Sequence, residues 1–346
     1  MTVHCYTSFS LSYLSRARVL AASIRKHHPD WTIWAVVTDL PPEHFTLVPG
    51  EDFDHVVWAK DLFQDLGEAW FFQHNVVEIC TAVKGRAAQM ILDSGTCDKL
   101  IYFDPDIAVF SDLTPILDAL DEHSTVLTPH QLTPETDDIA IRDNEVASLH
   151  YGTFNLGFLG LTNDDSARAV VDWWSDRLER WCHDRLDIGV FVDQKWFNLA
   201  PCYFEGVGIL RHPGMNVASW NISQRHINIL ASGEITVNDA PLGFYHFTKI
   251  GGPGDQMTER YAAGNLAVFE LWSWYRLALE RYQDPRIPEG WWAYATFEDG
   301  APIVDTMRRL YRERTDLRAA FPDPFRSGAN SLQAWFTARP FELEDR

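Results

Sequence analysis

The sequence predicts an α/β fold whose chain ends in a helical, aromatic-rich extension. Short apolar runs at residues 3–8, 32–38 and 100–103 alternate with helical patterns, which is typical of strand–helix–strand units. Beyond residue 258 the pattern becomes helical and rich in aromatic residues. The chain has 346 residues, of which 46% are hydrophobic, so it can bury a sizeable core.

The first elements predict one parallel crossover. Residues 3–8 read as a strand, residues 12–28 as an amphipathic helix, and residues 32–38 as a second strand that ends at Asp39. Strand–helix–strand spacing of this kind gives a right-handed connection between parallel strands. A third short strand is predicted at residues 55–58.

A second helix leads into the central strand. Asn75 is the predicted N-cap of a helix over residues 76–92, because Glu78 follows three residues later as in a capping box. The next apolar run, residues 100–103, reads as a strand buried on both faces. After a return to the sheet at residues 126–128, a polar, irregular stretch is predicted to form a loop near the site.

Two carboxylates follow the central strand. Side chains alternate along an extended chain, so Asp104 and Asp106 can project to the same side, while Pro105 prevents a helix between them. Ligands bind at the carboxyl end of strands in open α/β sheets, and a carboxylate pair there suits Mg²⁺ or Mn²⁺ shared with phosphates. The alternative is an Asp-Pro-Asp turn that merely ends the strand.

The composition of the chain and the absence of certain motifs reduce the number of functions that we expect. A net charge of −20 argues against nucleic acid as a partner and against polybasic docking on a membrane. No glycine-rich dinucleotide or P-loop motif follows the first strand, so we expect a metal to hold any phosphates. Five scattered cysteines, no signal-type segment and no transmembrane segment predict a cytoplasmic protein, free or peripheral at the inner face of the membrane.

Three further polar clusters lie in the second half. Asn155 stands beside glycines ahead of an apolar strand, Asp193 and Gln194 open a short helical segment after a long helix predicted over residues 165–186, and His246 lies within an aromatic strand. Each has a structural alternative: a bulged strand, a helix N-cap and a buried core histidine, respectively.

Taken in order, these motifs resemble those of retaining glycosyltransferases of the GT-A fold, most closely the family 8 type, over residues 3–249. The resemblance implies a Rossmann-like mixed sheet flanked by helices. It also implies transfer of a sugar from a nucleotide-sugar, first of all a UDP-sugar, to a carbohydrate or glycolipid acceptor with retention, in bacterial surface polysaccharide synthesis. The expected catalytic domain covers residues 1–258, with a nucleotide-sugar half at 1–128 and an acceptor half at 129–258, and residues 259–346 form the extension.

The resemblance also assigns roles to residues. Asp104, Asp106 and His246 would hold Mn²⁺ or Mg²⁺, Gln194 would lie near the anomeric carbon, and Asp193 is the alternative catalytic group. The residues expected to bind the donor are Thr7, Ser8, Asp39, Lys84, Asp104, Asn155 and Lys249. Lys249 departs from the family spacing, because it follows His246 by three residues and glycines come after it.

Other functions fit less well. A sugar-1-phosphate nucleotidyltransferase should show a glycine-rich, basic loop after the first strand, and residues 6–13 contain neither glycine nor lysine or arginine. A haloacid dehalogenase phosphatase needs its aspartates after the first strand, and an EF-hand needs a glycine and a closing glutamate. A non-catalytic carbohydrate-binding protein on a degenerate transferase fold stays open. The aromatic residues of the extension are either core or a stacking surface for an acceptor sugar.

Overall fold

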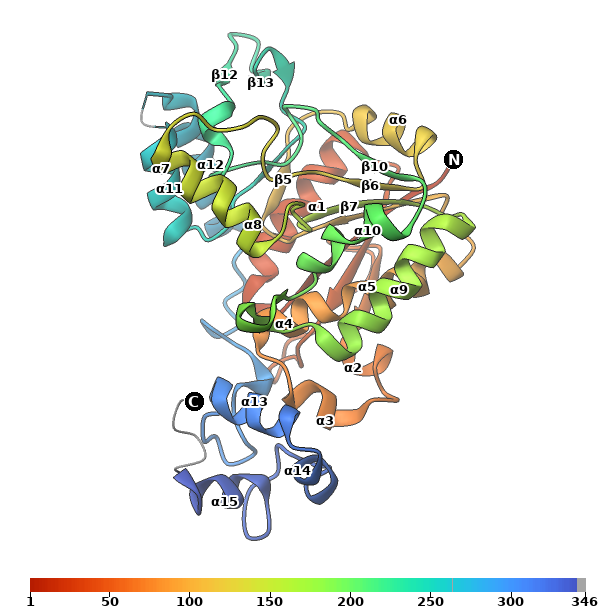
Figure 1. Cartoon of the computed structure of the whole chain (residues 1–346), viewed down its shortest axis with the longest axis vertical. Helices are drawn as coiled ribbons and strands as arrows, with labels where there is room; N and C mark the ends of the chain where they lie inside the picture. Colours follow the sequence, from red (N-terminus) through yellow and green to blue (C-terminus); the bar gives the residue numbers. More distant parts are fainter. Residues whose placement is uncertain (263, 341–346) are drawn as a thin grey trace.

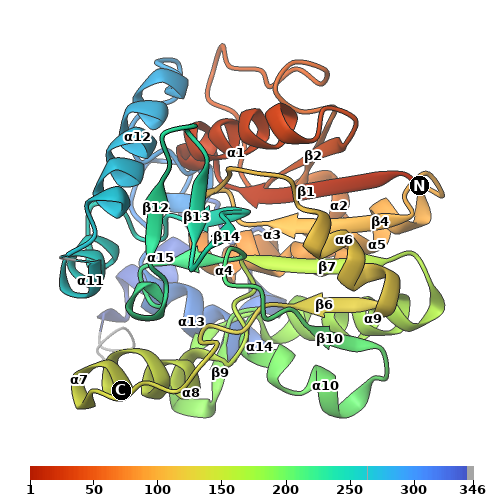
Figure 2. The same ribbon diagram turned by 90° about the horizontal axis from the view of Figure 1, so that it is seen from above.

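The computed structural model describes residues 1–262 and 264–340. Within these residues, seven strands form a mixed sheet in the order β10-β6-β7-β4-β1-β2-β3, with helices on both faces (Figures 1 and 2). Neighbouring strands are parallel except that β7 runs antiparallel to β4 and β6. The strands are β1 (Val3–Phe9), β2 (Thr32–Val37), β3 (His55–Trp58), β4 (Lys99–Phe103), β6 (Thr125–Leu127), β7 (Phe158–Thr162) and β10 (Val207–Ile209). The predicted α/β class with a mixed sheet flanked by helices is confirmed.

The predicted first crossover is present. β1 pairs in parallel with β2 and β4, and all of its side chains are buried. The connecting helix α1 (Leu14–His27) begins two residues later than expected, because a 3₁₀ turn at Leu11–Tyr13 comes first. Both faces of β1 are covered, as a strand at the middle of a parallel sheet requires.

A small second sheet joins distant parts of the chain. It consists of β11 (Val217–Ala218), β15 (Phe244–His246) and β5 (Ile107–Val109), with β15 antiparallel to β5. The pairing sets His246 opposite Ile107. The late aromatic strand is therefore held directly beside the segment that follows the Asp-Pro-Asp turn.

The helices on one face pack closely. The predicted helix over residues 76–92 is divided at Val83 into α4 (Val76–Ala82) and α5 (Lys84–Asp93), and Asn75 and Glu78 form the expected capping box. α5 lies against α9 (Asp165–Trp181) so tightly that a Cβ at Gly85 would stand 2.6 Å from the Cα of Ser175.

The expectation that the helix α9 extends to residue 186 is wrong. It ends at Trp181, because the chain turns into a short β-ribbon whose Asp184 pairs with Phe191.

The remaining elements are short and surround the sheet. They are α2 (Ala59–Leu62), α3 (Gly67–Phe72), α6 (Thr114–Glu122), α7 (Asp138–Ala140), α8 (Ala147–Tyr151), α10 (Ala200–Tyr203), β8 (Asp184–Arg185), β9 (Val190–Phe191), β12 (Ile227–Ile229), β13 (Ile235–Val237) and β14 (Ala240–Pro241). The predicted loop after β6 is irregular at first, and a π-helical turn at Ile141–Val146 then joins α7 to α8. In the part of the chain that the structure describes, no helix has the length and apolarity needed to cross a membrane.

The C-terminal helices pack in two separate places (Figure 1). α12 (Leu266–Tyr282) packs with β15 in one hydrophobic core. This core includes Tyr245 of β15 and Phe247, the residue after the strand. Three later helices form a second core with Phe72 of α3. They are α13 (Asp305–Glu313), α14 (Thr315–Ala320) and α15 (Leu332–Thr337). The expected boundary at residue 258 lies within α11 (Pro253–Ala262), and the domain division stays a prediction.

Candidate active site

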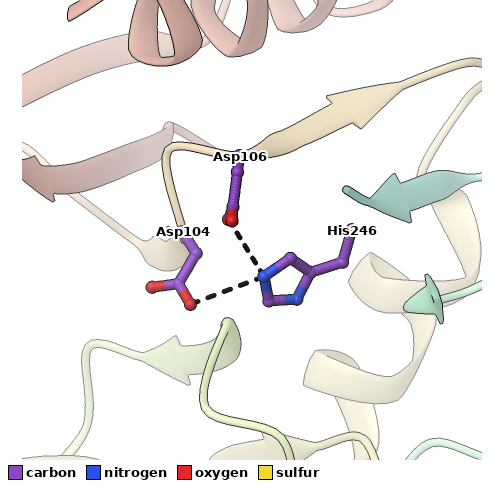
Figure 3. A group of neighbouring side chains, drawn as sticks. All are labelled: Asp104, Asp106 and His246. Atoms are coloured by element: carbon purple, nitrogen blue, oxygen red, sulfur yellow. Dashed lines mark ion pairs between the residues drawn. The ribbon is translucent and has the colours of Figure 1, made fainter. Parts of the chain in front are cut away.

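Two carboxylates and an imidazole meet at the carboxyl end of β4. Asp104 directly follows β4, Asp106 directly precedes β5, and His246 ends β15. Nε2 of His246 lies 2.9 Å from Oδ1 of Asp106 and 3.7 Å from Oδ2 of Asp104 (Figure 3). Among the described residues, these three form a group whose ligand atoms all lie within 4.8 Å of one another. We call this group the Asp–Asp–His cluster; its two carboxylates and single imidazole fit Mn²⁺ or Mg²⁺.

Asn155 orients the imidazole. Its Oδ1 lies 3.2 Å from Nδ1 of His246 and also accepts hydrogen bonds from the Gly157 backbone N–H at 3.2 Å and from Asn216 Nδ2 at 3.0 Å. An oxygen that faces three nitrogens is an acceptor, so Nδ1 of His246 carries the proton. Nε2 is then the nitrogen that can bind a cation, and it faces both carboxylates.

Because residue 157 is glycine and has no side chain, there is room for the imidazole of His246. A Cβ at Gly157 would stand 2.4 Å from Cε1 of His246 and 2.8 Å from Oδ1 of Asn155, far inside ordinary contact. Glycine at this position lets β15 and the strand β7 that follows Gly157 approach closely enough for the imidazole to reach the carboxylates.

The charges of the cluster stabilise one another. Burial alone would lower the pKa of His246, but the carboxylates of Asp106 and Asp104 outweigh it and raise that pKa. Burial raises the pKa of Asp106, whereas His246 and, after it, Arg16 lower it, and the net effect is a lowered pKa. The cluster thus keeps carboxylate character in a buried setting, which favours a bound cation.

Lys84 connects the cluster to a third carboxylate. Its buried Nζ lies 3.1 Å from Oδ1 of Asp104 and 2.8 Å from Oδ2 of Asp193, and it donates to the carbonyl of Leu156 at 3.1 Å. Burial would lower the pKa of Lys84, but Asp104 and Asp193 together raise it. Lys84 is therefore a fixed cation whose hydrogen bonds are already made within the protein.

Both polar atoms of the Gln194 side chain also have hydrogen-bond partners within the protein. Its Oε1 accepts hydrogen bonds from Asn155 Nδ2 and from the backbone N–H of Leu156, both at 3.2 Å, and its Nε2 donates to the carbonyl of Tyr151 at 3.2 Å. Asp193 does not serve as a helix N-cap, since its carboxylate is taken by Lys84. One hydrogen-bonded network therefore runs from Gln194 through Asn155 to the cluster.

Three of the residues expected to bind the donor, Thr7, Ser8 and Asp39, have different surroundings in the structure. Ser8 shares a hydrogen bond of 3.0 Å with the Tyr102 hydroxyl, whereas Thr7 points to the other face of β1 and its buried hydroxyl has no partner within the described chain. Asp39 accepts three backbone N–H groups, one of them from Ala293 at 2.8 Å, and burial raises its pKa to about 6.

Lys249 lies at the surface in a left-handed conformation with a φ of 52°. Burial and then the charge of Glu78 raise the pKa of Asp184, and the charge of Lys249 lowers it without reversing that rise. No hydrogen bond or ion pair joins Lys249 to the Asp–Asp–His cluster in the described part of the chain. Its predicted role in binding the donor stays a prediction.

Sequence reasoning missed several residues of this network. The Tyr102 hydroxyl donates to Oδ1 of Asp104 at 2.6 Å, and strand alternation could have indicated it, because Tyr102 stands two residues before Asp104. His130 and Asn216 both contact Asn155, and burial lowers the pKa of His130 to about 4. Neither has a sequence signal, because only tertiary contacts bring them to Asn155.

Comparison with known proteins gives remote relatives. No protein-family model matches the chain. Two Bacillus subtilis (strain 168) proteins, both described as uncharacterized, are similar in sequence. YfnF is 28% identical over 178 residues, which are 49% of this chain and 56% of YfnF, so the match spans little more than half of that relative's length. YfnD is 24% identical over 253 residues, covering 71% of this chain and 78% of YfnD.

Among solved structures, the galactosyltransferase LgtC in complex with donor and acceptor sugar analogs aligns with 76% of this chain and 96% of its own, at 18% identity and a TM-score of 0.46. The glycosyltransferase GlyE of Streptococcus pneumoniae TIGR4 aligns with 81% of this chain and 62% of its own, at 15% identity and a TM-score of 0.41. Mouse xyloside xylosyltransferase 1 aligns with 73% and 99%, at 11% identity and a TM-score of 0.43. At these values the similarities assign no activity to this chain.

Proposed function

We propose that the protein is a metal-dependent glycosyltransferase that moves a sugar from a nucleotide-sugar to a carbohydrate or glycolipid acceptor. The observation that carries this proposal is the Asp–Asp–His cluster at the carboxyl end of β4, joined by one hydrogen-bonded network to Asn155, Gln194 and Asp193. Oxygen-rich cation ligands beside amide and carboxylate groups suit a substrate that carries both phosphates and a sugar.

Each part of the network has a task in this reaction. A sugar–phosphate bond that breaks leaves negative charge on the diphosphate, and the chemistry that Mn²⁺ or Mg²⁺ supplies at the cluster is stabilisation of that charge. Asn155 holds His246 in the tautomer that exposes Nε2, and Lys84 keeps Asp104 in place. These contacts preorganise the cluster before the donor binds.

The contacts of Gln194 and Asp193 affect which stereochemistry we expect at the anomeric carbon. A double displacement would need a free carboxylate beside the anomeric carbon, and the Asp193 carboxylate is held by Lys84 at 2.8 Å. The Gln194 amide is neutral and can support positive charge on the sugar without attacking it. The resemblance to retaining glycosyltransferases favours retention, so we propose that the acceptor hydroxyl attacks the anomeric carbon on the face that the diphosphate leaves. The bond to the diphosphate breaks, and its departing phosphate oxygen takes the proton of the acceptor hydroxyl. An NMR time course that shows inverted product would contradict this part of the proposal.

Two other functions remain as alternatives to test. A sugar-1-phosphate nucleotidyltransferase would release pyrophosphate from a nucleoside triphosphate, and a carbohydrate-binding protein would turn over no donor at all. The site favours transfer over the first alternative, because residues 6–13 offer no glycine-rich basic loop for a triphosphate. A UDP-sugar is the donor we expect, with synthesis of a bacterial surface polysaccharide as the setting.

The decisive experiment measures release of nucleoside diphosphate from nucleotide-sugars with Mn²⁺ present. A thermal-shift screen selects the donor first, because a ligand that binds only the folded state raises the melting temperature. Asp106→Asn should abolish release while the melting temperature of the free protein changes little. If Asp106→Asn retains wild-type turnover, or if no nucleotide-sugar is turned over or bound, the proposed function is wrong.

A further inference from the structure

Arg16 is a cation without a carboxylate partner beside the Asp–Asp–His cluster. It lies half-buried in the first turn of α1, and its Cζ stands 4.2 Å from the centre of the Tyr13 ring. Although acidic residues outnumber basic ones by 49 to 29 and Glu280 borders the same surface hollow, no carboxylate in the described part of the chain lies within ion-pair distance of Arg16. Its guanidinium donors are therefore available to a ligand.

The packing of α1 places Arg16 level with Asp106. The backbone N–H of Val109 donates to Oγ of Ser23 at 3.0 Å, which aligns α1 with β5. From Ser23 back to Arg16 the helix covers about 10 Å. From Val109 back to Asp106 the extended chain covers about the same distance. Electrostatics agree with this placement, because the charge of Arg16 contributes to the lowered pKa of Asp106, after burial and His246.

Tyr275 brings an unused hydroxyl to the same place. Its ring stacks on Phe247 at 4.0 Å between centres, and the backbone N–H of Phe247 donates to the carbonyl of Asp106 at 2.8 Å. The Tyr275 hydroxyl is fully buried and has no hydrogen-bond partner among the residues whose positions the structure describes. Burial raises the pKa of Tyr275 most, the charge of Asp106 raises it further, and the charge of Arg16 lowers it. Buried hydroxyls are normally paired, so this unpaired hydroxyl is a second sign that a polar group belongs beside Asp106.

The other cations near the cluster are less suitable for an anion. Lys84 already donates to two carboxylates and one carbonyl, so it has no donor left for a phosphate. Lys249 is exposed, and its charge acts on Asp184 instead. The charge of Arg16, by contrast, acts on Asp106, and its guanidinium makes no hydrogen bond or ion pair with the residues that the structure describes.

We propose that Arg16, together with the Tyr275 hydroxyl, binds the phosphoryl oxygens of the donor diphosphate on the Asp106 side of the cluster. This inference rests on the proposed function, since it assigns residues to the leaving group of that reaction. A guanidinium binds two phosphoryl oxygens at once, and the hydroxyl adds a third donor. It also gives the C-terminal extension a part in the site, because Tyr275 belongs to α12.

The test uses inorganic pyrophosphate and Mn²⁺, measured by isothermal titration calorimetry on the full chain. With Mn²⁺ present, Arg16→Gln should weaken pyrophosphate binding by about tenfold, and Tyr275→Phe by a smaller factor. With Mn²⁺ alone, Arg16→Gln should bind the cation as tightly as the wild type or more tightly, because a positive charge beside Asp106 is removed. A merely structural role for Arg16 would weaken both ligands together.

Arg281→Gln is the matched control. Arg281 is also a cation over a tyrosine ring, with its Cζ 5.9 Å from the centre of Tyr282, but it is exposed on the last turn of α12. Its replacement should leave pyrophosphate binding unchanged. The proposal is overturned if Arg16→Gln matches Arg281→Gln, if it loses Mn²⁺ as well, or if the wild type binds no pyrophosphate. If binding depends on Arg16 but no nucleotide-sugar is turned over, the anion site stands and the proposed function fails.

Discussion

Replacement of Gly157 by alanine tests whether the close approach of β7 and β15 builds the metal site. The new Cβ would stand 2.4 Å from Cε1 and 2.7 Å from Nδ1 of His246, whereas ordinary contact begins at 3.4 Å. The imidazole must therefore move by about 1 Å, a displacement of the size that overpacking in a core produces at a cost of about 1–3 kcal/mol. The same Cβ presses on Oδ1 of Asn155 at 2.8 Å, so the residue that orients His246 is disturbed as well.

We expect Gly157→Ala to weaken Mn²⁺ binding by about 10- to 100-fold, the usual effect of disturbing groups that orient a ligand. Mn²⁺ affinity is measured by electron paramagnetic resonance titration, and the free energy of unfolding by urea denaturation. Gly160→Ala, three residues later and within β7, is the control, because its Cβ would lie 3.3 Å from the flexible end of Leu120. Wild-type Mn²⁺ affinity in a folded Gly157→Ala protein would refute the reasoning that His246 binds the cation.

Three further predictions concern charged and titrating groups. Lys84→Met should lower the free energy of unfolding by about 3–5 kcal/mol, because it leaves buried Asp193 unpaired. Adding Asp193→Asn should recover part of that loss in urea denaturation, and a double variant as unstable as the single one would contradict this explanation. Burial lowers the pKa of His74 to about 3, so the unfolded state binds more protons between that value and the usual 6.5, and stability falls as the pH is lowered through this window. In His74→Gln the slope of stability against pH between 5 and 6 should shrink by about 1.2 kcal/mol per pH unit, and an unchanged slope would mean that His74 is not held neutral. Arg308 donates to the carbonyls of Phe72, His74 and Tyr294, so Arg308→Met should expose the segment after residue 290 to limited proteolysis before the sheet; simultaneous cleavage would show that the two cores unfold together.

Much of the fold could be predicted because its signals are local. β3 has the predicted bounds, and the capping box at Asn75 and Glu78 forms as expected, since hydrophobic periodicity and cap residues act within a few positions of the chain. The helix expected to end at residue 186 was wrong because its end depends on a ribbon formed with residues 190–191, a contact that helical periodicity does not report.

In the candidate site, too, some residues follow from local sequence patterns and others only from tertiary contacts. Asp104 and Asp106 could be chosen from the sequence, since a buried strand that ends in two carboxylates is a local pattern. Nothing local distinguishes His246 from a core histidine; the resemblance pointed to it, and the pairing of β15 with β5 places it beside the carboxylates. The partners of Asn155, and the positions of Arg16 and Tyr275, follow only from packing between elements that are far apart in the chain.

The sequence by itself determined the strand–helix–strand start of the chain, the carboxylate pair at the end of a buried strand and the acidic balance that disfavours nucleic acid, because each follows from residue type and short-range spacing. The tertiary structure decided which groups share a site and which are already bound to one another: Lys84 is paired with Asp104 and Asp193, while Arg16 has no carboxylate partner in residues 1–262 and 264–340. The physical reason is that hydrogen bonds and ion pairs act over a few ångströms in space, and chain folding alone sets those distances.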